Sequence, residues 1–118
     1  MKDVSAKQTD AQDVYVLFTG AENEETGESW CPDCVTADPV LEKAVNEFQE
    51  REILVVKCPV IRSEYKNNSA YAYRRHKGIR LRCVPTFGRW VNHRLELKLE
   101  EAQCQDANVV QETLREEL

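Results

Sequence analysis

The sequence predicts a single α/β domain in which helices flank a four-stranded mixed sheet. Two near-continuous apolar runs, Asp13–Phe18 and Ile53–Cys58, are typical of strands buried on both faces. A helical pattern lies between them, and the last third of the chain contains a pair of predicted strands followed by a helix. At 118 residues the chain has room for one core, so one domain is expected.

The first half of the chain is predicted to form a strand–helix–strand unit. From Pro32 to about Glu50, apolar residues recur mostly three or four positions apart, which is the pattern of one helix face. Pro32 suits the first helical turn, where its missing N–H is no loss, and Pro39 should kink the helix. This helix lies between the predicted strands Asp13–Phe18 and Ile53–Cys58. The order predicts a βαβ unit in which the two strands are parallel and the crossover is right-handed.

The second half is predicted to contain a helix, two strands and a final helix, over Tyr65–His76, Thr86–Val91, Arg94–Leu99 and residues 106–116. Asn92-His93 stands where a two-residue hairpin turn would lie. Strict alternation of Leu95, Leu97 and Leu99 predicts that one face of the last strand is exposed to water. Asp106 is expected to cap the final helix.

Composition and charge exclude several classes of protein. Sixteen basic against 21 acidic residues, a net charge of −5, argue against nucleic-acid binding, which needs a basic face. No apolar run approaches the roughly 20 residues of a membrane span. Residues 1–12 are expected to be a polar arm without the apolar stretch of a signal peptide, and residues 13–118 the domain. Five cysteines cannot all pair, so a reducing, cytoplasmic location is expected.

The strongest candidate site is Trp30-Cys31-Pro32-Asp33-Cys34. Cys31 falls at a predicted helix start, where unpaired N–H groups and the helix dipole favour a thiolate. Such a placement lowers a cysteine pKa from about 8.5 into a range of roughly 3.5–7.5, so Cys31 is the expected nucleophile. Cys34 lies one turn further and is expected to be more buried and to resolve a mixed disulfide. The negative charge of Asp33 opposes the dipole, and the sequence leaves the balance open.

Other interpretations of this cysteine pair are a zinc site or a structural disulfide. Two cysteines three apart are half a zinc site, but the remaining candidate ligands form no second close pair: Cys58, Cys83, Cys104, His76 and His93. No metal is therefore expected. A structural disulfide is disfavoured in a reducing compartment. A redox-regulated binding module with little turnover stays as the alternative to an enzyme.

A second motif, Cys83-Val84-Pro85-Thr86, precedes the predicted strand Thr86–Val91. A proline at this position is either an ordinary turn or edge residue, or a cis proline that tertiary contacts support. The pattern alone leaves this choice open.

These features together resemble the thioredoxin superfamily. The shared features are a buried strand, Trp-Cys-x-x-Cys at a helix start, Pro39 eight positions after the first cysteine, a Val-Pro-Thr turn, and a closing hairpin and helix. More narrowly, four segments are similar to the family of thioredoxin domain-containing protein 17, the 14-kDa thioredoxin-related proteins: Phe18-Thr19-Gly20, Ser29–Val35, Ala37–Val40 and Cys104–Val110. The similarity runs from about Val14 to the end of the chain and is weakest between residues 63 and 82.

The resemblance implies a cytosolic thiol–disulfide oxidoreductase that reduces small or peptide disulfides such as cystine. It implies no bound cofactor, because thioredoxin reductase would recharge the dithiol with NADPH. The Glu-rich loop from Gly20 to Glu28 is expected to lie beside the thiols and to obstruct bulky or acidic partners.

The resemblance also implies residue roles. Pro85 would be cis and packed against the disulfide, and the Val84 backbone would pair with substrate as an added strand. Trp30, Pro32, Asp33 and Pro39 would support the site. Cys83, near the same surface, is a candidate accessory thiol, whereas Cys58 and Cys104 are expected to be structural.

Two departures from the family pattern stand out. Leu17 occupies the position at which thioredoxins carry a buried acid, so Asp33 or water would have to move protons instead. The usual N-terminal strand and helix are shortened or missing, which would leave Ile53–Cys58 at a sheet edge. A monomer is expected, with this edge covered by Met1–Gln12 or, alternatively, paired between two chains.

Overall fold

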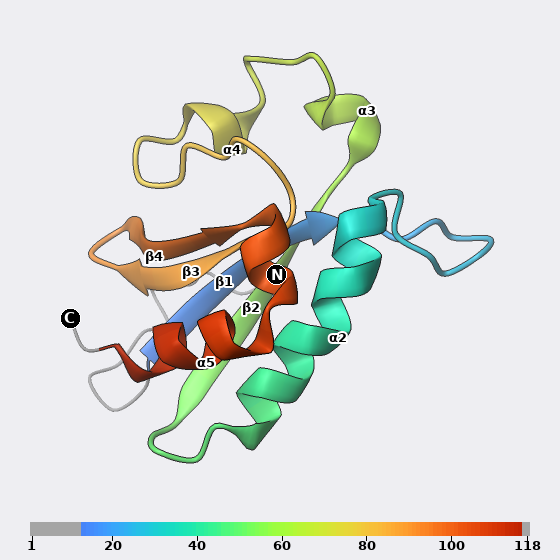
Figure 1. Cartoon of the computed structure of the whole chain (residues 1–118). Coiled ribbons are helices and arrows are strands. Elements are labelled where there is room, and N and C mark those ends of the chain that lie inside the picture. The colour runs from blue at the N-terminus through green and yellow to red at the C-terminus, as the bar shows by residue number, and fades with distance from the viewer. Residues whose placement is uncertain (1–12, 117–118) are drawn as a thin grey trace.

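A computed structural model of the chain describes residues 13–116, and its sheet has the predicted mixed topology (Figure 1). The strands are β1 (Asp13–Gly20), β2 (Ile53–Val60), β3 (Thr86–Val91) and β4 (Arg94–Glu100), in the spatial order β2-β1-β3-β4. β1 and β2 are parallel, whereas β1 and β3, and β3 and β4, are antiparallel. The α/β prediction is therefore confirmed. The expected polar arm, residues 1–12, lies outside the described residues.

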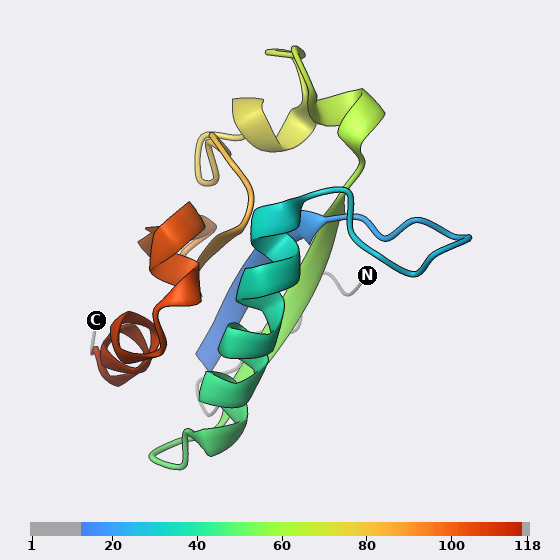
Figure 2. The same ribbon diagram turned by 45° about the vertical axis from the view of Figure 1, so that its right-hand side comes forward.

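The helices cover one face of this sheet and one of its ends. They are α2 (Pro32–Glu47), α3 (Arg62–Tyr65), α4 (Ala72–Arg75), the 3₁₀ helix η1 (Glu101–Gln105) and α5 (Ala107–Arg115). α2 and α5 pack on one face, and α3 and α4 lie beyond the end of the sheet at which α2 begins (Figures 1 and 2). Among residues 13–116, no helix has both the length and the hydropathy that crossing a membrane requires.

β1 is the central buried strand, and it separates two apolar clusters. Val14, Val16 and Phe18 face the cluster that contains both Cys31 and Cys34 and the residues around α3 and α4. Tyr15 and Leu17 face the other cluster, built mainly from α2 and α5. Val14 to Gly20 are all buried, as the near-continuous apolar run predicts.

The predicted helix over Tyr65–His76 is wrong. The segment forms two separate single-turn helices, α3 and α4, joined by a turn at residues 66–71. Asn67 has a positive φ of 53°, and the Asn68 side chain donates to Glu64 O and accepts from Ala70 N–H. Asparagine side chains that bond to nearby backbone groups compete with the helix, and here they interrupt it.

The predicted alternation of leucines along the last strand is also interrupted. The register between β3 and β4 shifts next to Phe87, and Leu97 takes a left-handed φ of 53°. Leu95 consequently pairs with Trp90 and joins the cluster of Cys34, whereas Leu99 pairs with Phe87 and joins the opposite cluster. A β-bulge of this kind reverses the side-chain alternation, so the three leucines do not share one face.

The hairpin turn and the helix cap that the sequence predicts in the last third of the chain are both present. Asn92 and His93 both have positive φ, 51° and 63°, as a tight two-residue hairpin turn requires. Asp106 caps α5, because its carboxylate accepts from the N–H groups of Asn108 and Val109.

β2 is the end strand of the described sheet, as the sequence indicates. Its exposed positions include Lys57 and Pro59, two residue types with which natural edge strands discourage further pairing. Cover by residues 1–12 falls outside the described residues, and pairing with a second chain stays a prediction.

Candidate functional site

Cys31 lies at the N-cap of α2, where the sequence predicts it. Its backbone is extended, Pro32 begins the helix, and its Sγ accepts a hydrogen bond from the Cys34 N–H at 3.2 Å. Its side chain is 5% exposed. Cys31 thus lies at the end of α2 where backbone N–H groups, that of Cys34 among them, attract negative charge. Asp33 is exposed in the same first turn.

Cys34 lies one turn further and is fully buried. Its Sγ accepts a hydrogen bond from the Gly20 N–H at 3.3 Å. Burial and the neighbouring Cys31 thiol raise the pKa of Cys34 to about 12. The two cysteines are therefore unequal, with one at the helix start and the other a buried thiol behind it.

Two residues to which the sequence assigned no role, Gly20 and Ser29, position Cys31. The Ser29 hydroxyl donates to Gly20 O at 2.8 Å and accepts from the Cys31 N–H at 3.2 Å. A Cβ at position 20 would lie 2.6 Å from Ser29 Oγ and 2.8 Å from Cys31 Cβ, so only glycine allows this approach. In the sequence, these two positions were indicated only by their place in the segments Phe18-Thr19-Gly20 and Ser29–Val35, which resemble the family.

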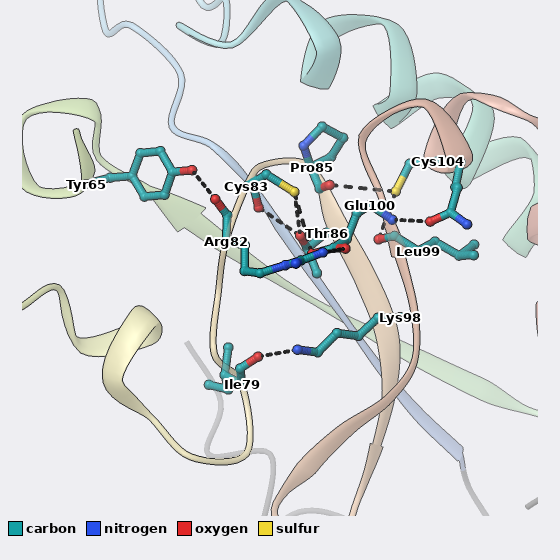
Figure 3. Close-up of polar contacts among 11 residues, drawn as sticks. Tyr65, Ile79, Arg82, Cys83, Pro85, Thr86, Lys98, Leu99, Glu100 and Cys104 are labelled. Carbon is teal, nitrogen blue, oxygen red and sulfur yellow. Dashed lines mark hydrogen bonds and ion pairs between the residues drawn. The ribbon is translucent and has the colours of Figure 1, made fainter. Parts of the chain in front are cut away.

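Trp30 joins the cysteine loop to the helical segment above the sheet. Its Nε1–H donates to Val60 O at 2.7 Å, and its ring lies 5.9 Å from that of Tyr65. The Tyr65 hydroxyl in turn donates to Arg82 O at 3.2 Å, in the segment that leads to Pro85 (Figure 3). Tyr65, which the sequence did not identify, thus links the two loops of the site.

The Val84–Pro85 peptide bond is cis, which decides the choice that the sequence left open. The segment brings Val84 O to 3.7 Å from Cys31 Sγ. Pro85 O accepts from the Glu101 N–H at 2.9 Å. The Thr86 hydroxyl donates to Cys83 O at 2.8 Å (Figure 3). These contacts hold the backbone of Val84 against the nucleophile candidate.

Cys83 is half-buried on the same loop and lies beside Glu100 (Figure 3). Its Sγ lies 3.7 Å from Glu100 Oε2, and the Glu100 carboxylate also pairs with Arg82 at 2.7 Å. Burial and the carboxylates of Glu100 and Glu101 raise the pKa of Cys83 to about 11. An attacking cysteine needs the opposite shift, so this environment disfavours reactivity.

Pro39, the remaining predicted site residue, lies further from the thiols, and Cys58 and Cys104 are the cysteines that the sequence predicts to be structural. Pro39 is exposed within α2, eight residues beyond Cys31, which corresponds to about 12 Å of helix rise. Cys58 and Cys104 are buried in the two clusters, as expected of structural cysteines. Within residues 13–116, no three His, Cys, Asp or Glu side chains are grouped closely enough to hold a metal ion.

The acidic loop projects from the end of β1 and returns at Ser29, next to the cysteine motif (Figure 2). Asn23 closes its turn by accepting from the N–H groups of Glu25 and Thr26, and Gly27 supplies a φ of +73°. The four glutamates are exposed. The base of the loop therefore lies next to the cysteine motif, whereas obstruction of partners by its glutamates stays a prediction.

Comparison of the chain with protein families agrees with this site geometry. The model of the thioredoxin domain of thioredoxin domain-containing protein 17-like proteins matches residues 1–116. The chain belongs to this family. Its fold is accordingly thioredoxin-like, and thiol–disulfide redox chemistry is the general function that this family suggests.

Individual relatives of this family agree. Thioredoxin domain-containing protein 17 of Homo sapiens is 29% identical over 107 residues, covering 91% of this chain and 81% of that protein. The protein of the same name from Epinephelus coioides is 32% identical over 99 residues, covering 84% and 75%.

Two further relatives are matched over a smaller share of their length. Thioredoxin-like protein Clot of Arabidopsis thaliana is 34% identical over 90 residues, which are 76% of this chain and 66% of that protein. Acireductone dioxygenase of Leishmania braziliensis is 36% identical over 77 residues, 62% of this chain but only 22% of that protein. The chain thus spans slightly less than two thirds of the first and about a fifth of the second.

Proposed function

We propose that the protein is a thiol–disulfide oxidoreductase that reduces small or peptide disulfides, such as cystine, through Cys31 and Cys34. The observation that carries the proposal is the placement of Cys31 at the start of α2, with its Sγ accepting the Cys34 N–H. Thioredoxin reductase with NADPH would recharge the dithiol, and the cytoplasm is the reducing compartment in which such a protein would act.

In the proposed reaction, the Cys31 thiolate attacks one sulfur of the substrate disulfide and forms a mixed disulfide, while the substrate S–S bond breaks and its other sulfur leaves as the first thiolate. Cys34 then attacks Cys31 Sγ, releases the second substrate thiol and leaves the Cys31–Cys34 disulfide. The 3.2 Å hydrogen bond from the Cys34 N–H to Cys31 Sγ supports this order of steps, because it stabilises negative charge on Cys31, the sulfur that attacks first.

Substrate preference follows from the surroundings of Cys31. The Val84 backbone beside the sulfur supports binding of an extended peptide as an added strand. The exposed glutamates of residues 22–28 disfavour bulky or acidic partners by obstruction and repulsion. Both features favour a small or peptide disulfide over a large acidic protein.

The test is NADPH consumption in the presence of thioredoxin reductase, with cystine and insulin as alternative substrates. We expect cystine to be reduced and Cys31→Ser to abolish its reduction. Cys83→Ser serves as the matched control and should retain the parental rate. Undiminished turnover by Cys31→Ser would overturn the proposal. Partner binding that changes with redox state, without turnover, would favour the alternative of a redox-regulated binding module.

A further inference from the structure

The resolving step poses a proton-transfer problem at Cys34. This thiol is fully buried, and its pKa is raised to about 12. Burial is the largest cause of this shift and persists when Cys31 is held in a mixed disulfide, so Cys34 is a protonated thiol at neutral pH. Attack on the mixed disulfide therefore requires a neighbouring group that takes the proton.

Thr19 is the polar side chain of β1 that lies against Cys34. Its side chain is buried, and its hydroxyl is within hydrogen-bonding reach of Cys34. The same hydroxyl donates to both carboxylate oxygens of Asp38, at 3.1 and 3.2 Å. Thr19 thus stands between a buried thiol and a carboxylate.

Asp38 lies one helical turn beyond Cys34 on α2, so both side chains lie on the same helix face. Its side chain is 25% exposed and pairs with Lys57 Nζ of β2 at 3.5 Å. Asp38, Lys57 and Leu17 line a cavity of about 310 Å³ that is partly open to solvent. A proton that reaches Asp38 can therefore pass to water, which the buried Cys34 cannot contact directly.

We propose that Thr19 and Asp38 form a relay that takes the Cys34 proton to solvent while Cys34 resolves the mixed disulfide. The proposal rests on the function proposed above. Leu17 occupies the place at which the resemblance leads one to expect an acid, and Asp38 supplies a carboxylate on the same side of the sheet. Asp33, the substitute suggested by the sequence, lies exposed in the first turn of α2.

The step balances in the following way. Cys34 Sγ attacks Cys31 Sγ and forms the bond between them, while the bond from Cys31 to the substrate sulfur breaks and the substrate leaves as a thiolate. The Cys34 proton passes to the Thr19 oxygen as the Thr19 hydroxyl proton passes to Asp38, which releases it to water. The two protein thiols are oxidised, the substrate disulfide is reduced, and the leaving thiolate takes a proton from solvent.

The titratable groups around this relay come from three elements. Lys57 faces Asp38 from β2, and Glu42, on α2, lines the same cavity. Cys104 of η1 lies within electrostatic reach of Asp38 and Cys34, but burial raises its pKa to about 12, so it carries no charge at neutral pH. The Lys57 ammonium, 55% exposed, is thus the partner that offsets the negative charge of the relay.

The test separates the two chemical steps with 5,5′-dithiobis(2-nitrobenzoate), in a Cys83→Ser background that removes the half-buried thiol. Attack by Cys31 releases the first 2-nitro-5-thiobenzoate, and resolution by Cys34 releases the second. We expect Asp38→Asn and Thr19→Val to leave the first release unchanged and to slow the second at least about tenfold at pH 7. Thr19→Ser, which keeps the hydroxyl, should retain the parental rate.

The pH profile distinguishes a relay from a merely structural role. Without the relay, hydroxide must remove the Cys34 proton, so the second release should accelerate about tenfold for each pH unit between 6 and 9. The parent should show a flatter profile, and the difference should shrink as the pH rises.

Each outcome decides between the proposals. A second release that keeps its parental rate and pH profile in Asp38→Asn would overturn the relay while leaving the proposed function intact. If Thr19→Val slows the second release but Asp38→Asn does not, Asp38 is not the group that receives the proton. A parent that gives no first release would instead refute the proposed function.

Discussion

The Sγ atom of Cys31 lies 3.7 Å from the carbonyl oxygen of Val84, although 53 positions separate the two residues in sequence. This contact joins the start of α2 to the cis Val84–Pro85 segment and places the Val84 backbone, which we propose pairs with substrate, directly beside the sulfur. It defines where a disulfide would have to lie to be attacked. The first prediction concerns the covalent intermediate that forms there.

Cys34→Ser is expected to trap a mixed disulfide on Cys31, because the hydroxyl cannot displace the substrate sulfur. After incubation with cystine, intact-mass measurement should show one added cysteinyl group in Cys34→Ser, and peptide mapping should place it at Cys31. The parent should instead lose two hydrogens as Cys31–Cys34 forms. An adduct located at Cys83 would contradict the assignment of the nucleophile.

Glu100→Gln is expected to make Cys83 more reactive. The Glu100 carboxylate lies 3.7 Å from Cys83 Sγ and helps to raise the pKa of the thiol to about 11. Removing its charge lowers this pKa, so alkylation of Cys83 by iodoacetamide at pH 8 should accelerate severalfold. Glu96→Gln, on the same strand, is the matched control and should leave the rate unchanged.

Glu100 should also contribute to stability in a pH-dependent way. The Arg82 guanidinium holds the pKa of Glu100 below its ordinary value of 4.5. A depressed acid stabilises the fold above its unfolded pKa and loses that contribution as the pH falls through its folded pKa. The difference in unfolding free energy between parent and Glu100→Gln should therefore be present at pH 7, small because Arg82 is exposed, and should decrease as the pH falls below about 4.5.

Gly20→Ala is expected to disturb the site more than the fold elsewhere. The added Cβ would lie within 3 Å of Ser29 Oγ and Cys31 Cβ, so the cysteine loop must shift at a cost of about 1–3 kcal/mol. Urea unfolding should report this loss, and the attack of Cys31 on a small disulfide should slow. Gly27→Ala has no atom within 4 Å of its Cβ but is strained at a φ of +73°, so it should cost some stability while leaving the attack rate unchanged.

Neutralising the acidic loop should change substrate preference through charge. With Glu22, Glu24, Glu25 and Glu28 replaced by glutamine, reduction of the acidic glutathione disulfide should accelerate by a small factor, on the order of two- to fivefold at low salt. The gain should disappear at about 1 M salt, where screening acts over only about 3 Å. An equal gain for an uncharged disulfide would indicate relief of obstruction rather than of charge.

Much of the architecture follows from local patterns. The apolar run of Asp13–Phe18 predicts a strand buried on both faces, and each of its residues from Val14 onward is buried. The placement of Cys31 at a helix start follows from Pro32 and the helical spacing after it, and it is observed as an N-cap. Such features depend on neighbours in sequence, so the sequence by itself determines them.

Local patterns fail where competing interactions are close in energy. Residues 65–76 carry a helical pattern, but the Asn68 side chain bonds to the backbone on either side of it and breaks the helix. On β4, alternation is correct for Leu95 and Leu99 as buried residues, but the bulge at Leu97 turns them to opposite faces.

The sequence by itself determined the α/β order, the cysteine pair at the start of α2 and the acidic loop beside it. Only the tertiary structure decided that Val84–Pro85 is cis beside Cys31 and that Thr19 joins Cys34 to Asp38. The physical reason is distance along the chain. Helix starts and buried strands arise from residues a few positions apart, whereas these contacts bring together separate elements that only the packed core holds in register.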